Sequence, residues 1–342
     1  MTQALRFPAE WEPQSAVLLA WPHADTDWAD RLDSVETTFA ALIAAITRFE
    51  RALVLVPDAE IEARARERLE PVAEMARVRF ERLPYDDTWL RDSGPITLRQ
   101  GEGFRLLDFR FTAWGGKFES SQDDRIVAGL GDRGVFGAAE RERVDFALEG
   151  GGIETDGDGT LLTTWRCLHE RHPDLSREEI SARLQAWLCQ QRTLWLDHGY
   201  LEGDDTDAHI DTLARFAGTD AIVYQGCQDP DDPHHAELQA MAAELVAFTQ
   251  ANGEPYRLFE LPWAQPIIDH GRRLAASYAN FLIVNGAVLM PAYGDPADEP
   301  ARRVLAEAFP DREIVSVPCR PLIWQNGSLH CITMQVPLGA LG

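Results

Sequence analysis

Cys331, near the C-terminal end of the chain, is placed where its thiol could act as a nucleophile. It follows segment 324–330, which is rich in turn-forming residues around which other groups can approach the backbone closely. Apolar and polar residues alternate over 329–336, which predicts a half-buried strand that begins beside the thiol. A buried cysteine that only packs as a small hydrophobe produces the same pattern. This segment alone therefore leaves both interpretations open.

Four residues upstream could act together with a thiol, although each also has a purely structural interpretation. Asp92 follows Trp89 by three residues, in a segment equally typical of a capped turn around a core tryptophan. Glu149 precedes three glycines, which allow a close approach to the backbone but also occur in plain loops. His209 and Asp211 are two residues apart, so we expect their side chains on one face of an extended segment. With an acid so near, the histidine is a credible proton carrier.

The elements that must position these residues recur along the chain. Strands are predicted at 16–21, 52–57, 77–83 and 329–336, and helices at 34–49, 58–70, 177–190, 235–250 and 298–309. Hairpin turns are predicted at 101–103, 156–159, 217–220 and 285–286, about sixty residues apart. We therefore expect one α/β domain, residues 1–342, built from five repeated units.

The C-terminal strand is expected to complete the first unit, which lacks a leading strand of its own. Pairing of the two chain ends would close a ring of units and leave no exposed sheet edge. Asp92, Glu149, His209 and Asp211 stand at the starts of leading strands, and Cys331 starts the strand of the closing unit. Because strand starts around a ring point at a common axis, we expect one pocket with three carboxylates, an imidazole and a thiol.

The composition limits the classes of protein to which the chain can belong. Hydrophobic residues make up 45%, yet no apolar run approaches the roughly 20 residues of a membrane span, and no signal peptide is evident. Five cysteines without a CxxC pair argue against a disulfide framework and a structural zinc site. The net charge of −24 disfavours nucleic acid and is compatible with a small cationic partner. We expect a cytoplasmic protein without membrane contact; a homodimer is left open.

Six short motifs stand in a characteristic order: TWLRDSGP (88–95), AWGG (113–116), LEGGG (148–152), DDTDAHID (204–211), YANF (278–281) and GSLHCITMQ (327–335). Together they resemble the family of agmatine deiminases and bacterial-type (Porphyromonas-type) peptidylarginine deiminases, over essentially the whole chain. This resemblance implies the pentein fold, a five-bladed ββαβ propeller with pseudo-fivefold symmetry. The implied fold agrees with the five units expected above.

The resemblance also implies a role for each candidate residue. Cys331, the only one of the five cysteines in a site motif, would be the nucleophile, and His209 the general acid and base. Asp92, Glu149 and Asp211 would be the polar partners of a guanidinium. Carboxylates accept N–H bonds in paired geometry, so we expect Asp92 and Asp211 to clamp the guanidinium, with Glu149 orienting His209 or sharing the clamp. The thiolate would release ammonia through a covalent thiouronium, without a metal or any other cofactor.

The substrate side of the site is less sharply defined by sequence. Trp89 and Trp114 are candidates for aromatic walls that attract a cation, although both could be core residues. An acidic run leads into His209 and consists of Glu202, Asp204, Asp205 and Asp207. The run is either a solvated loop or a contact for the cationic tail of the substrate. Asp205 is the candidate for that contact. No basic residue lies in that run or in 324–329. We therefore expect an agmatine deiminase that forms N-carbamoylputrescine for putrescine biosynthesis.

Other functions remain open at this point. The first alternative is a deiminase of peptidylarginine or free arginine, and a less favoured one is a non-catalytic guanidine-binding protein, which would need neither His209 nor Cys331. A papain-like thiol hydrolase does not call for three carboxylates around its thiol. The chain departs from the family pattern at Ala208, where glycine is usual, and at 325–328, where a glycine-rich run is usual. Neither departure removes a reacting group, so the chemistry is inferred more securely than the substrate specificity.

Overall fold

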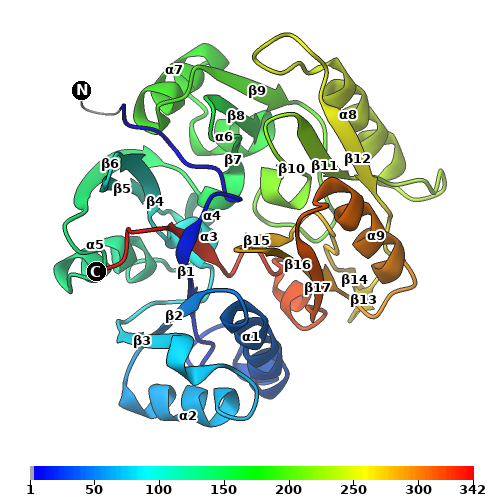
Figure 1. Cartoon of the computed structure of the whole chain (residues 1–342). Helices are drawn as coiled ribbons and strands as arrows, with labels where there is room; N and C mark the ends of the chain where they lie inside the picture. The colour runs from blue at the N-terminus through cyan, green and yellow to red at the C-terminus, as the bar shows by residue number, and fades with distance from the viewer. Residues whose placement is uncertain (1–3) are drawn as a thin grey trace.

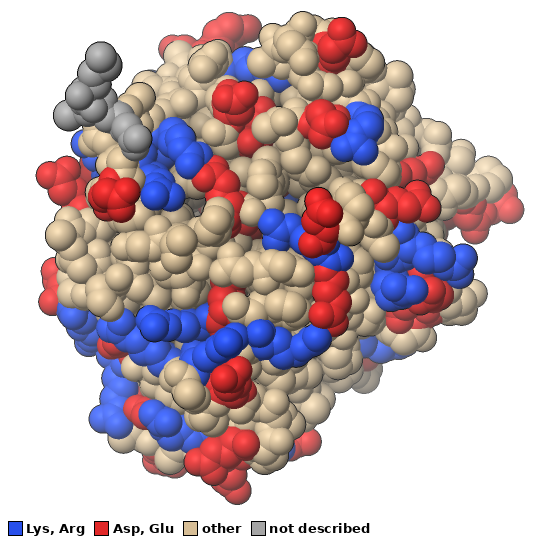
Figure 2. Space-filling view, in the orientation of Figure 1, with Lys and Arg blue, Asp and Glu red and all other residues tan. Residues whose placement is uncertain are grey.

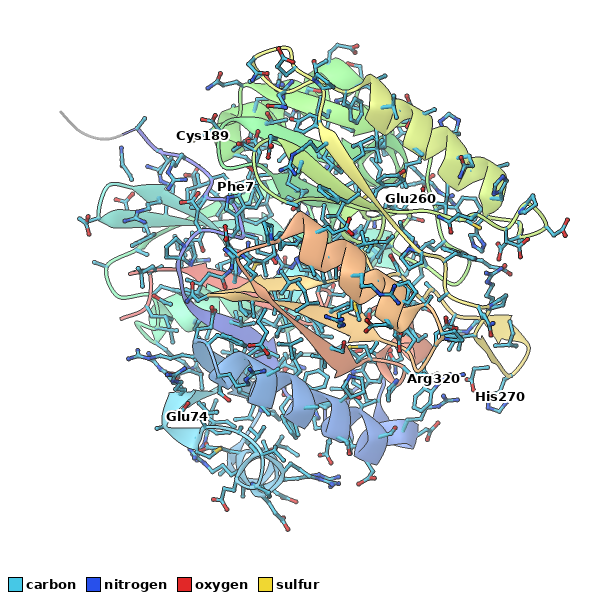
Figure 3. The ribbon with its side chains drawn as sticks, turned by 45° about the vertical axis from the view of Figure 1, so that its right-hand side comes forward. Phe7, Glu74, Cys189, Glu260, His270 and Arg320 are labelled. Carbon is cyan, nitrogen blue, oxygen red and sulfur yellow. The ribbon has the colours of Figure 1, made fainter. Side chains whose placement is uncertain are left out.

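Five small sheets surround a common centre in the computed structural model, which describes residues 4–342 (Figure 1). The fold is mixed α/β, with the longer helices on the outside of the sheets. The sheets are, in strand order, β18 (Met334–Pro337), β1 (Gln14–Ala20), β2 (Arg51–Val56) and β3 (Val78–Arg82); β4 (Ile96–Gln100), β5 (Gly103–Arg110) and β6 (Glu140–Ala147); β7 (Ile153–Thr155), β8 (Thr160–Thr164) and β9 (Arg192–Leu196); β10 (Ala214–Phe216), β11 (Ala221–Gln225) and β12 (Arg257–Leu261); and β15 (Leu282–Val284), β16 (Ala287–Ala292) and β17 (Glu313–Pro318). A separate hairpin of β13 (Ile268–Asp269) and β14 (Arg272–Arg273) projects from the body near His270 (Figure 3).

Five helices confirm those that the sequence predicts, to within three residues at each end: α1 (Leu32–Thr47), α2 (Ala59–Leu69), α7 (Arg177–Leu188), α8 (His235–Ala247) and α9 (Asp298–Ala308). The starts of two of them, α2 and α7, follow from capping. The Asp58 carboxylate accepts the first free N–H groups of α2, and Ser176 and Glu179 cap α7 reciprocally. Four shorter helical segments were not predicted: α3 (Leu90–Ser93), α4 (Ala113–Gly116), α5 (Ile126–Asp132) and α6 (Trp165–Arg171).

Each unit combines an antiparallel pair of strands with a third strand that is added in parallel, and in four of the five units the antiparallel pair is a hairpin. In the third unit, β7 pairs antiparallel with β8, and β9 returns after α6 and α7 to pair in parallel with β8. The four predicted hairpin turns are all confirmed. Gly157, Gly159 and Gly286 adopt φ values of 72°, 100° and 79° in these turns, a region that glycine enters without steric cost.

The two ends of the chain pair as predicted. β18 runs antiparallel to β1, with Leu18 opposite Met334 and Ala16 opposite Val336, so the C-terminal strand completes the first unit. The sheets nevertheless remain separate from one another in the described residues. Strands β3, β6, β9, β12 and β17 are therefore outer edges, and the expectation of a ring without sheet edges is wrong. The units meet through packed side chains and not through a continuous hydrogen-bond ladder.

Two segments near the candidate site are not the strands that the sequence predicts. The strand expected at 329–336 begins only at Met334, and Cys331 lies in the turn before it. His209 and Asp211 do not share an extended segment, because Ile210–Thr212 forms a single 3₁₀ turn directly after His209. Threonine hydroxyls donate to nearby backbone carbonyls in both segments. Such local bonds compete with strand pairing.

Charge is distributed unevenly over the surface. Figure 2 shows a band of Lys and Arg side chains across one face, in spite of the net charge of −24. Exposed arginines commonly pair with acids, as Arg48 does with Glu313 at 2.8 Å and Arg105 with Glu142 at 3.2 Å. None of the helices described here is both long and apolar enough to cross a membrane. The expectation that nucleic acid is excluded stays a prediction.

Candidate active site

A cavity of about 760 Å³ brings together segments that are far apart in the sequence. Both Cys331 and Asp92 line it, and each is 5% exposed. Glu149, His209 and Asp211 are fully buried beside them. The structure thus brings together all five residues that the sequence suggests as catalytic. The three suggested substrate contacts, Trp89, Trp114 and Asp205, also line the cavity.

The thiol of Cys331 lies beside a carboxylate and an amide. Its Sγ is 3.7 Å from Oδ2 of Asp211, and Nδ2 of Asn280 donates to Sγ at 3.2 Å. Burial, together with the negative charges of Asp211 and Asp92, raises the pKa of Cys331 well above its usual value. The free protein therefore holds a protonated thiol at neutral pH, and the thiol needs a cation nearby to ionise.

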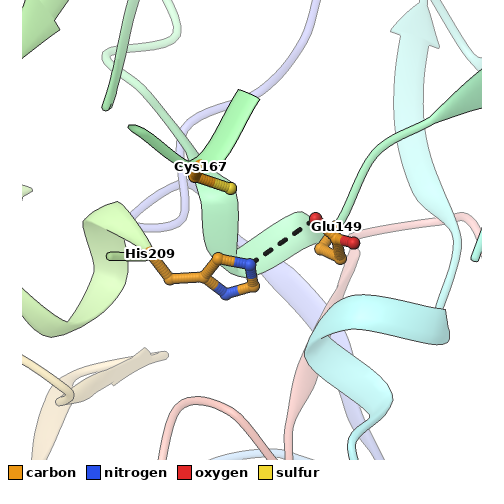
Figure 4. A group of neighbouring side chains, drawn as sticks. All are labelled: Glu149, Cys167 and His209. Carbon is orange, nitrogen blue, oxygen red and sulfur yellow. Dashed lines mark ion pairs between the residues drawn. The ribbon is translucent and has the colours of Figure 1, made fainter. Parts of the chain in front are cut away.

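The ring of His209 lies between two carboxylates. Nδ1 is 3.7 Å from Oδ1 of Asp92, and Nε2 is 3.6 Å from Oε2 of Glu149 (Figure 4). Burial alone would lower the pKa of His209, but Asp92, Cys167 and Glu149 together raise it well above its usual value. The imidazole is therefore protonated at neutral pH and is able to donate a proton.

Asp92 is held by two donors. The backbone N–H of Gly151 donates to Oδ1 at 2.9 Å, and Nε1 of Trp114 donates to Oδ2 at 2.9 Å. Burial raises the pKa of Asp92 to about 6, against the attraction of His209. Trp114 therefore positions Asp92 in addition to lining the cavity.

Asp211 heads a chain of buried charges that the sequence does not predict. Its Oδ2 lies 2.8 Å from Nδ1 of His330, whose Nε2 is 2.8 Å from Oε2 of Glu10. Arg215 donates to that same oxygen of Glu10 at 2.9 Å. Burial opposes ionisation of Asp211, but the hydrogen bond with His330 and the charges of His330, His209 and Arg215 hold its pKa below the usual value. Asp211 is therefore an anion at neutral pH.

Among the five candidate catalytic residues, two buried carboxylate oxygens have no hydrogen-bond partner in the described part of the chain, Oδ1 of Asp211 and Oε2 of Glu149. The other oxygen of Glu149 accepts from Nε of Arg171 at 2.8 Å. Burial opposes ionisation of Glu149, yet His209 and Arg171 hold its pKa below the usual value. Buried polar atoms are seldom left without partners. Free anionic oxygens beside a thiol are the arrangement expected of a site that receives a cationic donor.

Backbone strain gathers around the cavity. Five non-glycine residues near it have positive φ: Ala113, Trp114, Asp207, Ala208 and Asn326. The left-handed conformation costs such residues roughly 1–2 kcal/mol each, and strain of this kind clusters at functional sites. Ala208, at φ 70°, occupies a conformation that glycine adopts more easily, so this departure from the family pattern adds strain and keeps the backbone path. Asn326, in the other departing segment, donates to Asp205 at 2.7 Å.

The cavity is also lined by a basic residue that the loop sequences do not reveal. Arg272, on β14, is the only Lys or Arg among the lining residues of this cavity, and it donates to Asn326 and to the carbonyl of Trp324. Eight acids line the same cavity: Asp25, Asp27, Asp86, Asp87, Asp92, Glu119, Asp123 and Asp205. The cavity wall is therefore strongly acidic even with Arg272 present.

Sequence reasoning missed several residues of the site. Cys331 is not the only cysteine there, because Cys167 on α6 lies beside His209 and Glu149 (Figure 4). Asn280 belongs to a recognised motif and His330 adjoins the nucleophile, and these positions are signals that could have pointed to both. No comparable signal marks Cys167.

Comparisons with known proteins agree with this geometry. The profile of the family "Porphyromonas-type peptidyl-arginine deiminase" matches residues 6–337. The chain belongs to this family. It is 36% identical over 357 residues to the agmatine deiminase of Stutzerimonas stutzeri (strain A1501), covering 96% of this chain and 95% of that protein.

Solved structures extend the likeness to three dimensions. An agmatine deiminase of C. jejuni with substrate bound has a TM-score of 0.90 and 33% identity, covering 98% of this chain and 96% of that one. A putative arginine deiminase of Porphyromonas gingivalis has a TM-score of 0.92 and 46% identity, covering 99% and 100%. Relatives thus carry names for more than one guanidine substrate.

Proposed function

We propose that this protein is an agmatine deiminase, which hydrolyses agmatine to N-carbamoylputrescine and ammonia. The observation that carries the proposal is the pair of buried carboxylates near the Cys331 thiol: Asp211, 3.7 Å from Sγ and with one oxygen without a partner among the described residues, and Asp92, which lines the same acidic cavity as Cys331. Agmatine is a dication, with a guanidinium at one end and an ammonium at the other. The carboxylates of Asp92 and Asp211 suit the guanidinium, and the acids farther along the cavity suit the ammonium.

We further propose that the five units form a pentein propeller of five ββαβ blades, and that residues 1–342 make one catalytic domain. The five separate sheets around one centre support this proposal. An amidinotransferase of Microseira wollei, only 10% identical, superposes with a TM-score of 0.51 over 98% of this chain, which is a likeness of fold alone.

The guanidinium is planar and carries five N–H donors. In this proposal Asp92 and Asp211 accept those donors and hold the central carbon near Sγ of Cys331. Glu149 orients His209, whose Nε2 lies 3.6 Å from its carboxylate. The rigid support of these groups, by Trp114 for Asp92 and by His330 for Asp211, favours one orientation of the substrate.

The bonds change in two stages. The thiolate of Cys331 attacks the guanidinium carbon, and the tetrahedral adduct collapses as the C–N bond breaks, its electron pair leaving with ammonia after His209 has protonated that nitrogen. A covalent thiouronium remains on Cys331. His209, now neutral, takes a proton from water, and the resulting hydroxide attacks the same carbon. As the C–S bond breaks, the hydroxyl loses its proton to solvent, which returns the thiolate and releases the neutral ureido product.

Binding of the substrate is expected to activate the nucleophile. The pKa of Cys331 is raised by burial and by Asp211 and Asp92. A guanidinium clamped between the same two carboxylates would offset their charge and lower the pKa of the thiol. The thiol loses its proton only when a cation is present to be attacked, which protects the free enzyme from oxidation of a thiolate.

A deiminase of arginine or peptidylarginine is the second candidate, and a specific observation favours it. Arg272 lines the cavity, and a guanidinium is a suitable partner for a carboxylate. Against it, Arg272 already donates to Asn326 and Trp324, and eight acids share the wall. Replacement of Arg272 by glutamine separates the two candidates, because only an arginine enzyme would lose its preferred substrate.

The substrate itself provides the direct test. We expect kcat/KM for agmatine to exceed that for free arginine, and for a blocked arginyl peptide, by about a hundredfold or more, equivalent to about 2.7 kcal/mol of transition-state stabilisation. Ammonia release from the three compounds at equal concentration measures the ratio. Equal or faster turnover of the peptide would refute the agmatine assignment and leave the deiminase chemistry in place.

The clamp predicts the effect of removing one charge at a time. Asp92→Asn and Asp211→Asn retain the shape of each side chain but lose charge-assisted hydrogen bonds worth about 1.5–3 kcal/mol. Each should lower kcat/KM for agmatine by about tenfold or more. Asp158→Asn, in the exposed β7–β8 turn, is the matched control and should behave as wild type. Wild-type efficiency in both folded site variants would show that the guanidinium is held elsewhere.

A further inference from the structure

The thiol of Cys167 adjoins the catalytic residues Glu149 and His209 without having a part in the proposed chemistry. Glu149, Cys167 and His209 each offer one possible ligand atom, and these atoms lie within 4.8 Å of one another (Figure 4). All three residues are buried. They come from three different segments: Glu149 follows β6, Cys167 lies on α6, and His209 precedes the 3₁₀ turn.

The nitrogen and oxygen ligand atoms are not occupied by hydrogen bonds. Both ring nitrogens of His209 and Oε2 of Glu149 are buried without a hydrogen-bond partner among the described residues. Nε2 and Oε2 stand 3.6 Å apart. Ligand atoms around a tetrahedral zinc ion are separated by roughly 3.4–3.6 Å, as the usual Zn–N, Zn–O and Zn–S bond lengths require. The spacing of the imidazole and the carboxylate therefore already fits a zinc ion.

The backbone beside the cluster leaves space on one flank. A Cβ atom added to Gly152 would lie 3.3 Å from Sγ of Cys167 and 3.8 Å from Nε2 of His209. A side chain at this position would therefore crowd the thiol and contact the imidazole. Glycine keeps the thiol and the imidazole free to approach a shared ion.

We propose that Glu149, Cys167 and His209 form an inhibitory site for Zn²⁺. A thiolate, an imidazole and a carboxylate are a zinc-binding set, and the thiolate favours zinc over magnesium or calcium. The two anionic ligands neutralise the ion. Two other charges face the cluster: Arg171 donates to Glu149 at 2.8 Å, and Asp92 is 3.7 Å from His209. The positive charge of Arg171 and the negative charge of Asp92 offset each other. The thiol and the imidazolium release their protons when the metal binds.

Zinc bound here would stop the reaction without touching the nucleophile. It would occupy Nε2 of His209 and Oε2 of Glu149, so that His209 could no longer transfer protons. The consequence for activity rests on the proposed function, whereas the binding itself does not. In the absence of zinc, the reaction at Cys331 proceeds as described above.

Direct binding is tested on the intact chain with zinc in competition against a chromogenic chelator, and with Co²⁺ as a spectroscopic probe. Wild type, Cys331→Ala and Cys227→Ala should each bind one ion, with a thiolate-to-cobalt charge-transfer band. Cys227 is the control because it is equally buried and lies outside the cluster. Cys167→Ala and the closer-sized Cys167→Ser should lose the band and bind zinc about a hundredfold more weakly. Undiminished binding in both Cys167 variants, or its loss in Cys331→Ala, would overturn the site.

Inhibition is tested by ammonia release from agmatine over a range of free zinc. Measured against its own zinc-free rate, Cys167→Ala should need about tenfold or more zinc for half inhibition, whereas Cys227→Ala should match wild type and recover with a chelator. Equal zinc sensitivity in Cys167→Ala would refute the inhibitory role. Absence of ammonia release in every protein would count against the proposed function alone, because the cobalt band still reports the site.

Discussion

Replacement of Cys331 by alanine is expected to reduce ammonia release from agmatine by about 10⁴-fold or more. The reason is that Sγ is the atom which forms the covalent bond to the guanidinium carbon, and no other thiol touches both Asp211 and Asn280. Steady-state kinetics on the purified variant measure the loss. A haloacetamidine should add mass to wild type at Cys331 and leave the alanine variant unmodified.

The remaining cysteines provide the controls for this result. Cys189→Ala, Cys227→Ala and Cys319→Ala should keep wild-type activity, because none of these residues lies in the catalytic group. Cys167→Ala should also turn over agmatine, although its side chain adjoins His209. Activity near wild type in Cys331→Ala would refute the covalent mechanism, whatever the other variants do.

A methyl group at position 151 is expected to be almost as damaging as loss of the nucleophile. The Cβ of alanine would lie 2.6 Å from Nδ1 of His209, 2.8 Å from Oδ1 of Asp92 and 3.2 Å from Oδ2 of Asp211. The first two separations are shorter than carbon atoms tolerate, so these side chains must move. Because a displacement of about 1 Å at a catalytic group costs about a hundredfold, Gly151→Ala should lower kcat/KM by about 10²–10³-fold.

Gly131→Ala is the matched control for this substitution. Gly131 lies in helix α5, and its Cβ would meet only Cδ of Arg141, at 3.8 Å. Alanine is favoured over glycine in a helix by about 1 kcal/mol, so this variant should retain activity with an equal or higher melting temperature. Measurement of melting temperature for Gly151→Ala separates misplacement of the site from failure to fold. If folded Gly151→Ala matched wild type in kcat/KM, the proposed crowding of the three side chains would be wrong.

The repeated units could be predicted because their signals are local. Alternation of apolar residues marks the strands, and the glycines at 157, 159 and 286 mark hairpin turns through their positive φ. The pairing of β1 with β18 was also within reach, since a unit without its leading strand needs one from elsewhere. The local pattern predicted the wrong structure where hydrogen bonds between residues close in sequence form a turn in place of a strand, as at Cys331 and at 210–212.

The site was predictable only in part, because tertiary packing creates the rest of it. Cys167 comes close to His209 because Oγ1 of Thr164, at the start of α6, donates to the carbonyl of Ala208 at 2.7 Å. Nothing in the sequence around residue 167 reveals that contact. The same is true of Glu10, which meets His330 although the two stand 320 positions apart. Motifs identify the reacting groups, whereas the buried charges that support those groups are brought together only when the chain folds.

The antiparallel pairing of β1 with β18 also has a consequence for biosynthesis. On the ribosome, one side of β1 has no neighbour until residues 21–333 have been translated, which takes roughly 15–60 s at ordinary elongation rates. During that time the apolar side chains Val17, Leu18 and Leu19 border an open hydrogen-bonding edge, a template for pairing with another nascent chain. Cys331 is translated at the end of the same interval. The reactive thiol is therefore synthesised together with β18, the strand that covers the open edge of β1.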